Sequence, residues 1–150
     1  MAHTFSLYSR AIDEQTAAYA ALRRGNIRLA VDLFKEVAKL TGVIVKLEEA
    51  NHEELTSIEL TKNISILSSR KAEILSIAEN PNRATDEDLR IWNQLFPTQP
   101  FEEISTKTQN LKNAELRRMA RAIYPKDLFK QICFVRGIHP DSLKIVPLRR

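Results

Sequence analysis

Apolar residues recur at helical intervals in two successive segments near the start of the chain. An alanine-rich run begins at Asp13 and ends before Gly25, and alanine is the residue most favourable to helix. In residues 27–40, apolar side chains stand at the i, i+3, i+4 and i+7 positions of an amphipathic helix: Ile27, Ala30, Val31, Phe34, Val37, Ala38 and Leu40. Gly42 is placed to take the left-handed conformation that often follows a last helical turn. The pattern predicts a helical hairpin whose second helix closes at residues 41–42.

The pattern is less regular over residues 43–79. The β-branched residues 43–45 favour a strand, but no alternating partner segment accompanies them, so helix is the preferred interpretation. Asn51 followed by Glu54 resembles a capping box, in which two side chains bond the unpaired N–H groups at a helix start. Further apolar residues recur at helical spacing: Leu60, Ile64, Leu67, Ile74 and Ala78. Whether this region forms one helix or two stays open.

Prolines and capping residues divide the rest of the chain. Pro81 is the strongest break, because proline disfavours helix at the preceding residue and donates no backbone hydrogen bond. Thr85, followed by three acidic residues, predicts a helix start, and Pro97 ends that helix. Pro100 opens another helix. The helices expected here cover residues 85–96, 100–123 and 126–136, and Gly137 ends the last of them.

These elements predict an all-α fold, an irregular bundle of six to seven helices with a helical hairpin at its start. A chain of 150 residues fits one domain, residues 1–150. The break at residues 80–84 is a candidate hinge between an N-terminal bundle, residues 10–79, and a basic C-terminal helical part, residues 85–150.

Small and large side chains alternate at a characteristic spacing in the first hairpin: Ala18, Gly25, Ile27, Ala30, Phe34 and Val37. Over residues 11–42 this spacing resembles a single tetratricopeptide repeat, in which two helices pack closely where small residues meet. The same hairpin also resembles the start of a microtubule-interacting-and-trafficking bundle. The next stretch of repeat length does not continue the pattern, so a tandem array is not expected. The resemblance implies peptide or protein binding on a helical surface rather than catalysis.

Glycine is scarce, with three residues at positions 25, 42 and 137. Phosphate-binding loops, dinucleotide fingerprints and hydrolase elbows need clustered glycines, so these motifs are excluded. His52 begins a segment like a zinc-protease helix, but Thr56 stands where the second histidine ligand is needed. We therefore predict no catalytic residue, no metal site and no cofactor, and expect that the chain is not an enzyme.

The net charge of +4 is concentrated at one end. Residues 111–150 carry ten lysines and arginines against three acidic residues, a net of +7, so the remainder of the chain is net −3. Such a basic face can bind phosphates through guanidinium groups, or the acidic groups of a protein partner. The candidate partner-binding or phosphate-binding residues are Lys112, Arg117, Arg118, Arg121, Lys126 and Lys130.

Two function classes follow. The leading hypothesis is a non-enzymatic helical protein–protein interaction module, of adaptor, chaperone, effector or inhibitor type, acting through helical surfaces and the basic C-terminal face. The alternative is a small nucleic-acid-binding regulator that uses residues 111–150, where a helix, a glycine turn and a short second helix follow one another. The sequence leaves the partner and the oligomeric state open.

Two aromatic residues and the location of the chain complete the analysis. Trp92 and Phe96 are candidate recognition anchors if exposed and core residues if buried, and their i, i+4 spacing favours burial. The longest apolar stretch is far too short to span a membrane, and the lone Cys133 suits a reducing compartment. A cytoplasmic location is expected.

Overall fold

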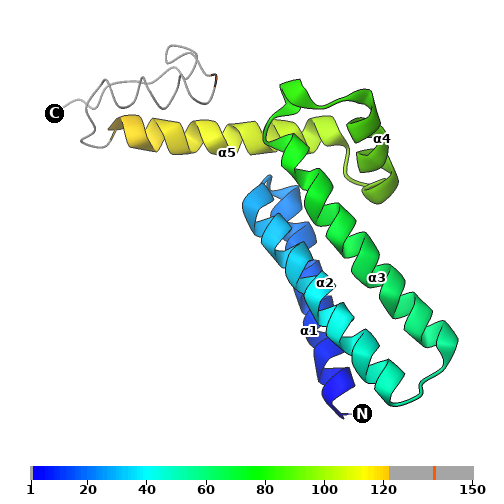
Figure 1. Ribbon diagram of the computed structural model, residues 1–150. Coiled ribbons are helices and arrows are strands. Elements are labelled where there is room, and N and C mark those ends of the chain that lie inside the picture. Colours follow the sequence, from blue (N-terminus) through cyan, green and yellow to red (C-terminus); the bar gives the residue numbers. More distant parts are fainter. Residues whose placement is uncertain (1, 122–136, 138–150) are drawn as a thin grey trace. The chain divides into compact units, whose positions relative to one another are not determined.

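The computed structural model describes residues 2–121 and residue 137. Its α-helices, in chain order, are α1 (Ala2–Arg23), α2 (Ile27–Ala50), α3 (Leu55–Ile74), α4 (Asp86–Leu95) and α5 (Phe101–Arg121), with 3-10 turns at Leu75–Ala78 and Pro81–Arg83 (Figure 1). All regular structure in this described part is helical, which confirms the all-α prediction. Its five α-helices are fewer than the six to seven expected, and the helix expected over 126–136 lies outside the described residues.

The chain forms two compact units, Met1–Thr108 and Gln109–Arg150, and α5 contributes to both. The first unit contains α1 to α4 and the beginning of α5. The candidate hinge at residues 80–84 stays a prediction. In residues 80–84, Pro81 starts the 3-10 turn Pro81–Arg83 and so occupies a position that needs no backbone N–H donor.

Seven of the nine buried residues of α2 recur at alternating intervals of three and four along the whole helix: Ile27, Ala30, Phe34, Val37, Thr41, Ile44 and Glu48. This spacing keeps one stripe of side chains on the inner face. The predicted helix end at residues 41–42 is therefore wrong, because the buried stripe carries α2 past Gly42. Residues 43–45 are helical, as the sequence favoured.

The helix α3 presents small and polar side chains to α2. At the same intervals of three and four, the inward residues of α3 are Ile58, Thr61, Ser65, Ser68 and Ala72, and Leu75 continues the series in the 3-10 turn that follows. The Ser65 hydroxyl donates to the carbonyl of Ala38 at 3.0 Å. A Cβ added to Gly42 would lie 3.9 Å from the Ser65 Oγ. Because the distance between two helices depends on the side chains at their contact, these residues allow α2 and α3 to approach closely.

The capping box predicted from Asn51 and Glu54 does not form in the turn between α2 and α3. Asn51 ends α2, and its N–H donates to the carbonyls of Leu47 and Glu49. His52 then has φ 54, and α3 begins at Leu55 with no side-chain cap from Glu54. The region left open by the sequence is therefore two helices. Farther on, α4 starts as predicted, because the Thr85 hydroxyl and the Asp88 carboxylate form a reciprocal capping box.

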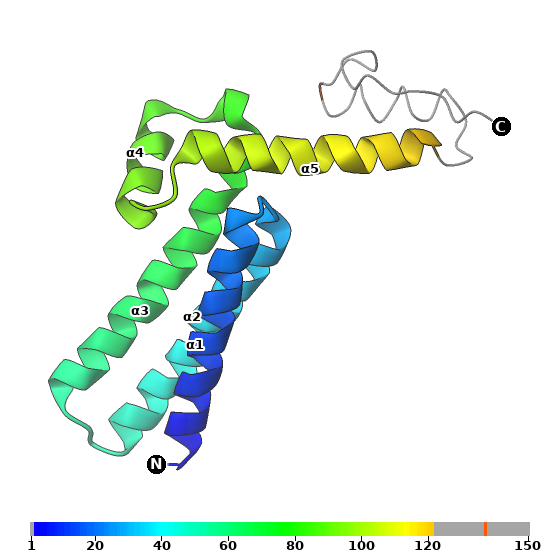
Figure 2. The same ribbon diagram turned by 180° about the vertical axis from the view of Figure 1, so that it is seen from behind.

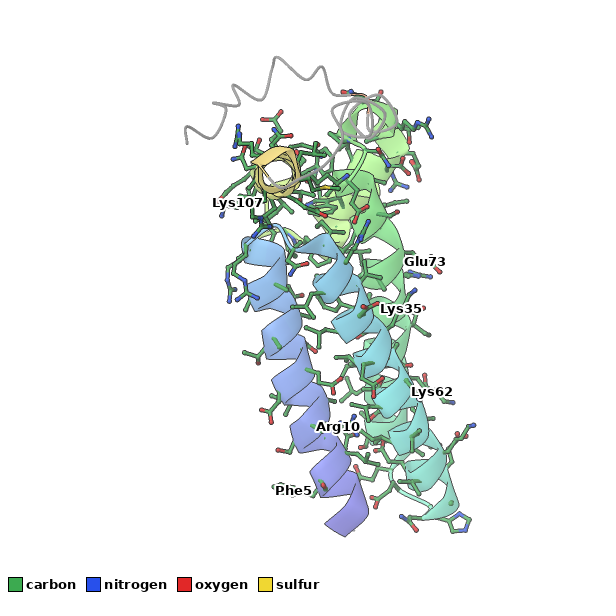
Figure 3. The ribbon with its side chains drawn as sticks, turned by 90° about the vertical axis from the view of Figure 1, so that its left-hand side faces the viewer. Phe5, Arg10, Lys35, Lys62, Glu73 and Lys107 are labelled. Atoms are coloured by element: carbon green, nitrogen blue, oxygen red, sulfur yellow. The ribbon has the colours of Figure 1, made fainter. Side chains whose placement is uncertain are left out.

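The beginning of α5 lies against the turn between α1 and α2. Figure 3 shows Lys107 at this end of the bundle. Gly25 has φ +80, and a Cβ there would lie 2.6 Å from the carbonyl carbon of Lys107. Ile104 on the same part of α5 is buried in the core with Phe34 and Phe96. Glycine is therefore required at position 25 both by the turn and by the close approach of α5.

Two glycine substitutions should have opposite effects. We expect Gly25→Ala to lower the free energy of unfolding by about 2–4 kcal/mol, because it adds backbone strain and an overlap with Lys107. Gly42→Ala should raise it by about 0.5–1 kcal/mol, since alanine favours helix and its Cβ meets only ordinary contact. Urea unfolding followed by circular dichroism measures both. A Gly25→Ala variant as stable as the original chain would contradict the close approach, and a destabilised Gly42→Ala variant would contradict the packing of α3.

Candidate interaction surface

The helices α1 and α3 each pack along α2 (Figure 2), and their own backbones come close at few points. Side chains join them instead. Tyr8 of α1 contacts Thr61 of α3 at 2.5 Å, and Lys71 of α3 donates to the Tyr19 hydroxyl at 2.7 Å. Tyr8 and Tyr19 follow the same order along α1 as Thr61 and Lys71 along α3, so the two helices run in the same direction.

Large apolar side chains of α3 remain exposed on one flank of this helix. Leu60, Ile64, Leu67 and Lys71 follow one another at intervals of four, three and four, so they share one flank of α3. Lys71 reaches Tyr19, and this flank therefore faces α1. Leu60 is 60% exposed, and Ile64 and Leu67 are exposed as well. Of the apolar series predicted within residues 43–79, only Ile74 and Ala78 are buried.

The helix α1 contributes a matching flank that the sequence analysis missed. Phe5, Tyr8, Ile12 and Tyr19 fall on one side of α1 at intervals of three, four and seven. Ile12 is 63% exposed and lies between the two tyrosines that contact α3. Figure 3 shows Phe5 near the start of α1. We call the exposed residues of these two flanks the α1–α3 face: Phe5, Ile12, Leu60, Ile64 and Leu67.

A hydrogen-bonded group lies at the end of the bundle near the turn between α2 and α3. Glu48 is buried, and its two carboxylate oxygens accept from the Tyr8 hydroxyl at 3.1 Å and the Ser57 hydroxyl at 2.8 Å. Burial raises the pKa of the Tyr8 hydroxyl; the hydrogen bond to Thr61 acts in the opposite direction, and Glu48 adds to the rise. Because the buried acceptor has two donors, this group holds α1, α2 and α3 together without an unpaired carboxylate.

The opposite end is held by a lysine among aromatic rings. The Lys71 ammonium lies 5.2 Å from the centre of the Tyr19 ring, 5.9 Å from that of Phe34 and 5.8 Å from that of Phe96. Its bond to the Tyr19 hydroxyl is short, at 2.7 Å. Cation–π attraction to several ring faces favours a partly buried ammonium. Lys71 therefore has a structural role, holding α3 against α1 and the aromatic core.

Trp92 and Phe96 are core residues, so the alternative that they are exposed recognition anchors is wrong. Trp92 is fully buried and Phe96 is 2% exposed. The Trp92 indole donates to the carbonyl of Gln99 at 2.7 Å, and its ring packs edge-on against Phe101. An exposed anchor must reach a partner, whereas these two rings fix the connection between α4 and α5 onto the bundle.

A pocket of about 440 Å³ lies between α4 and the end of α3. Arg70, Glu73 and Asp88 bring charge to it, and Ile74, Ile77 and Ile91 are among its apolar residues. Its lining contains no histidine or cysteine. The pocket offers a mixed polar and apolar surface.

The predicted basic residues lie partly within the described chain. Lys112, Arg117 and Arg118 are on α5, where Arg118 is exposed and the other two are half-buried. Arg121 is the last residue of α5, and Lys126 and Lys130 lie outside the described residues. Leu116 on the same helix is buried. The grouping of the six residues into one surface stays a prediction.

Two features of the described residues bear on metal binding and on membranes. Across residues 2–121 and 137, no three His, Cys, Asp or Glu side chains are grouped so that they could hold a metal ion. None of the helices in the described part has the length and apolar character needed to cross a membrane. Comparisons of the chain with protein-family models, with curated proteins and with solved structures find no match.

The hydrogen bonds to Glu48 should contribute measurably to stability. We expect Tyr8→Phe to lower the free energy of unfolding by about 1–2 kcal/mol, because the buried Glu48 loses a donor. Ser9→Ala removes a hydroxyl from an exposed position of the same helix and should change the value by less than about 0.5 kcal/mol. Urea unfolding measures both variants. Equal stabilities for Tyr8→Phe and the original chain would show that this hydrogen bond does not hold α1 in place.

Proposed function

We propose that this chain is a non-enzymatic helical protein–protein interaction module and that the α1–α3 face is its docking surface. The observation that carries the proposal is the exposure of Ile12, Leu60 and Leu67 on facing flanks of two helices. Single exposed apolar residues are common on proteins, whereas a contiguous apolar patch marks a binding surface. Ile12 lies between Tyr8 and Tyr19, which contact α3, and Leu60 and Leu67 share a flank of α3 with Lys71, which bonds Tyr19, so we infer that these side chains belong to one patch.

The expected partner element is an amphipathic helix. A further helix that packs against α1 and α3 would give four helices around one core. The exposed residues of α3 repeat at helical spacing, which suits apolar residues at i, i+3, i+4 and i+7 on the incoming helix. Binding would bury Leu60, Ile64 and Leu67 without moving the residues that already hold α1 and α3 together.

The hairpin of α1 and α2 is part of this proposal as a tetratricopeptide-repeat-like element. Ala18 and Ala30 are fully buried, and Phe34 fills the space beside them. Gly25 takes the left-handed conformation at the turn. These features support close packing of the two helices through small residues, as the resemblance implies.

The non-enzymatic character is supported by how the buried polar groups are used. Glu48, Ser57 and Thr61 bond one another or the backbone, and Thr41 donates to the carbonyl of Val37. Lys71 is engaged by Tyr19 and the surrounding rings. Polar side chains that satisfy one another in the core stabilise the fold and offer no group for proton transfer to a substrate.

The docking surface can be tested by affinity capture from a cell extract, with bound protein and bound nucleic acid both analysed. We expect the original chain to retain a protein and the Leu60→Asp/Leu67→Asp variant to lose it, because carboxylates on the face must be desolvated on binding. Leu55→Asp is the matched control: Leu55 is 79% exposed at the start of α3, where an acidic residue suits the helix dipole.

Each outcome of the capture experiment decides the proposal. Circular dichroism melts establish that all three proteins are folded. Loss of a specific protein from the Leu60→Asp/Leu67→Asp variant alone supports the α1–α3 face. Capture that is equal in all three proteins moves the docking surface elsewhere, and turnover of a screened substrate without any bound partner refutes an interaction module.

A nucleic-acid-binding regulator is the second candidate, favoured by the net +7 of residues 111–150 and the exposed Arg118 on α5. We expect replacement of Arg117, Arg118 and Arg121 by glutamine to weaken binding to duplex and single-stranded oligonucleotides. The negative slope of log affinity against log salt concentration should become shallower by about 2–3, corresponding to three lost phosphate contacts. Fluorescence anisotropy over a salt series measures this slope. Absence of binding to either oligonucleotide at low salt would eliminate this candidate.

A further inference from the structure

The pocket between α3 and α4 has an apolar lining that is fixed by the core. Its volume of about 440 Å³ lies within the range of small-molecule sites, about 300–1,000 Å³. Ile77, Ile91 and Leu95 are half-buried and pack against the hydrophobic core, and Ile74 is buried. These four residues also line the pocket. The apolar part of the pocket is therefore preformed in the fold.

Charged side chains of both signs line the same pocket. Arg70 and Glu73 are one helical turn apart on α3, and both are exposed. Neither side chain forms an ion pair with another described residue. Figure 3 shows Glu73 on the side of α3 away from α1. The pocket therefore offers a cation and an anion that no other group in the described part of the chain neutralises.

The helix α4 adds a second carboxylate, that of Asp88, to the lining. Its Oδ2 atom accepts from the N–H of Thr85 at 3.0 Å, in the capping box at the start of α4. The capping box holds this carboxylate in position. Because a carboxylate can accept about four hydrogen bonds, Asp88 can accept further bonds from a ligand.

These groups together match the parts of an α-amino acid. A guanidinium such as that of Arg70 binds a carboxylate through two parallel hydrogen bonds, and the carboxylates of Glu73 and Asp88 can accept from an ammonium. Helical residues three apart have Cβ atoms about 5–6 Å from each other, so Arg70 and Glu73 can reach neighbouring groups of one small molecule. A fatty acid would leave the two carboxylates without a cation, and a simple amine would leave the guanidinium without an anion.

We propose that the pocket between α3 and α4 binds a free α-amino acid with an apolar side chain. Arg70 binds the carboxylate of the ligand, Glu73 and Asp88 bind its ammonium, and the isoleucines and Leu95 contact its side chain. The inference goes beyond the proposed function, because the pocket lining includes no residue of the α1–α3 face. A ligand in this position contacts both α3 and α4, so binding stabilises the contact between the two helices.

Calorimetric titration of the full chain with free L-leucine and L-phenylalanine tests the proposal. We expect saturable binding of at least one of them at a single site. Three kinds of matched probe each lack one group: glycine lacks the apolar side chain, the N-acetyl derivative lacks the ammonium, and the amide derivative lacks the carboxylate. Each should bind at least about tenfold more weakly than the free amino acid, because a charge-assisted hydrogen bond or the apolar contact is lost.

Two variants assign the charged groups. Arg70→Gln should weaken binding of the free amino acid about tenfold but leave binding of the amide derivative unchanged, since the amide already lacks the partner of the guanidinium. Glu73→Gln should likewise reduce the preference for the free amino acid over the N-acetyl derivative. Arg90→Gln and Glu59→Gln are the matched controls, because both residues are exposed and lie outside the pocket lining. Asp88 is left unchanged, since its replacement would remove the capping box.

Several results would overturn the inference. The absence of saturable binding by both amino acids excludes the site, and equal binding of the free amino acid and its two derivatives excludes recognition by the charged residues. Arg70→Gln and Glu73→Gln variants that are folded by circular dichroism and bind as tightly as the original chain place any binding elsewhere. Both positions are exposed, so the two variants are expected to fold. Capture of a protein through Leu60 and Leu67 is measured separately, so failure of this inference leaves the proposed function standing.

Discussion

The close approach of α2 and α3 through small residues determines the arrangement of the whole bundle. Ala38 and Gly42 of α2 meet Ser65 of α3, and the Ser65 hydroxyl bonds the Ala38 carbonyl directly. Large side chains cannot occupy this contact, so the leucines and isoleucines of α3 lie on its flank rather than against α2. Because α2 also packs along α1, the two outer helices share one support and have little backbone contact with each other (Figure 2). The exposure of these leucines and isoleucines follows from the residues that make the α2–α3 contact.

The separation of α1 and α3 is maintained by side chains at two levels. Near the turn between α2 and α3, Tyr8 spans the space to Thr61 and to the buried Glu48. At the other level, the Tyr19 hydroxyl accepts a hydrogen bond from the Lys71 ammonium, which also lies over the rings of Phe34 and Phe96. Hydrogen bonds to buried or charged groups are costly to leave unmade, so each tyrosine resists both collapse and separation of the helices. The surface between these two levels is therefore largely preformed, and a partner helix would pay little to organise it.

The sequence predicts helices well where periodicity or local chemistry decides the structure, and poorly where packing decides it. The three–four spacing of α2 and the Thr85 capping box are local signals, and both elements form. Gly42 was expected to end a helix, but the buried stripe of α2 and the contact with Ser65 keep that residue helical. The buried state of Trp92 followed from its spacing relative to Phe96. The α1–α3 face could not be predicted in the same way, because it depends on which flank of α3 turns inward, and single-helix periodicity favours the apolar flank.

The orientation of α3, which turns small and polar side chains toward α2, is the strongest argument that its exposed leucines and isoleucine serve binding. Leu60, Ile64 and Leu67 each stand directly before an inward residue, namely Thr61, Ser65 and Ser68. A rotation of α3 by about one residue, or 100°, would bury the three large side chains, and fully burying one such side chain contributes about 1.5–3 kcal/mol. The observed orientation is held instead by Ile58, Ala72 and Leu75 in the core and by the bonds of Thr61 and Ser65. A sequence selected only for the stability of the isolated bundle would place its leucines inward. Local conflicts of this kind between apolar pattern and packing are expected at functional surfaces, where a second molecule completes the burial.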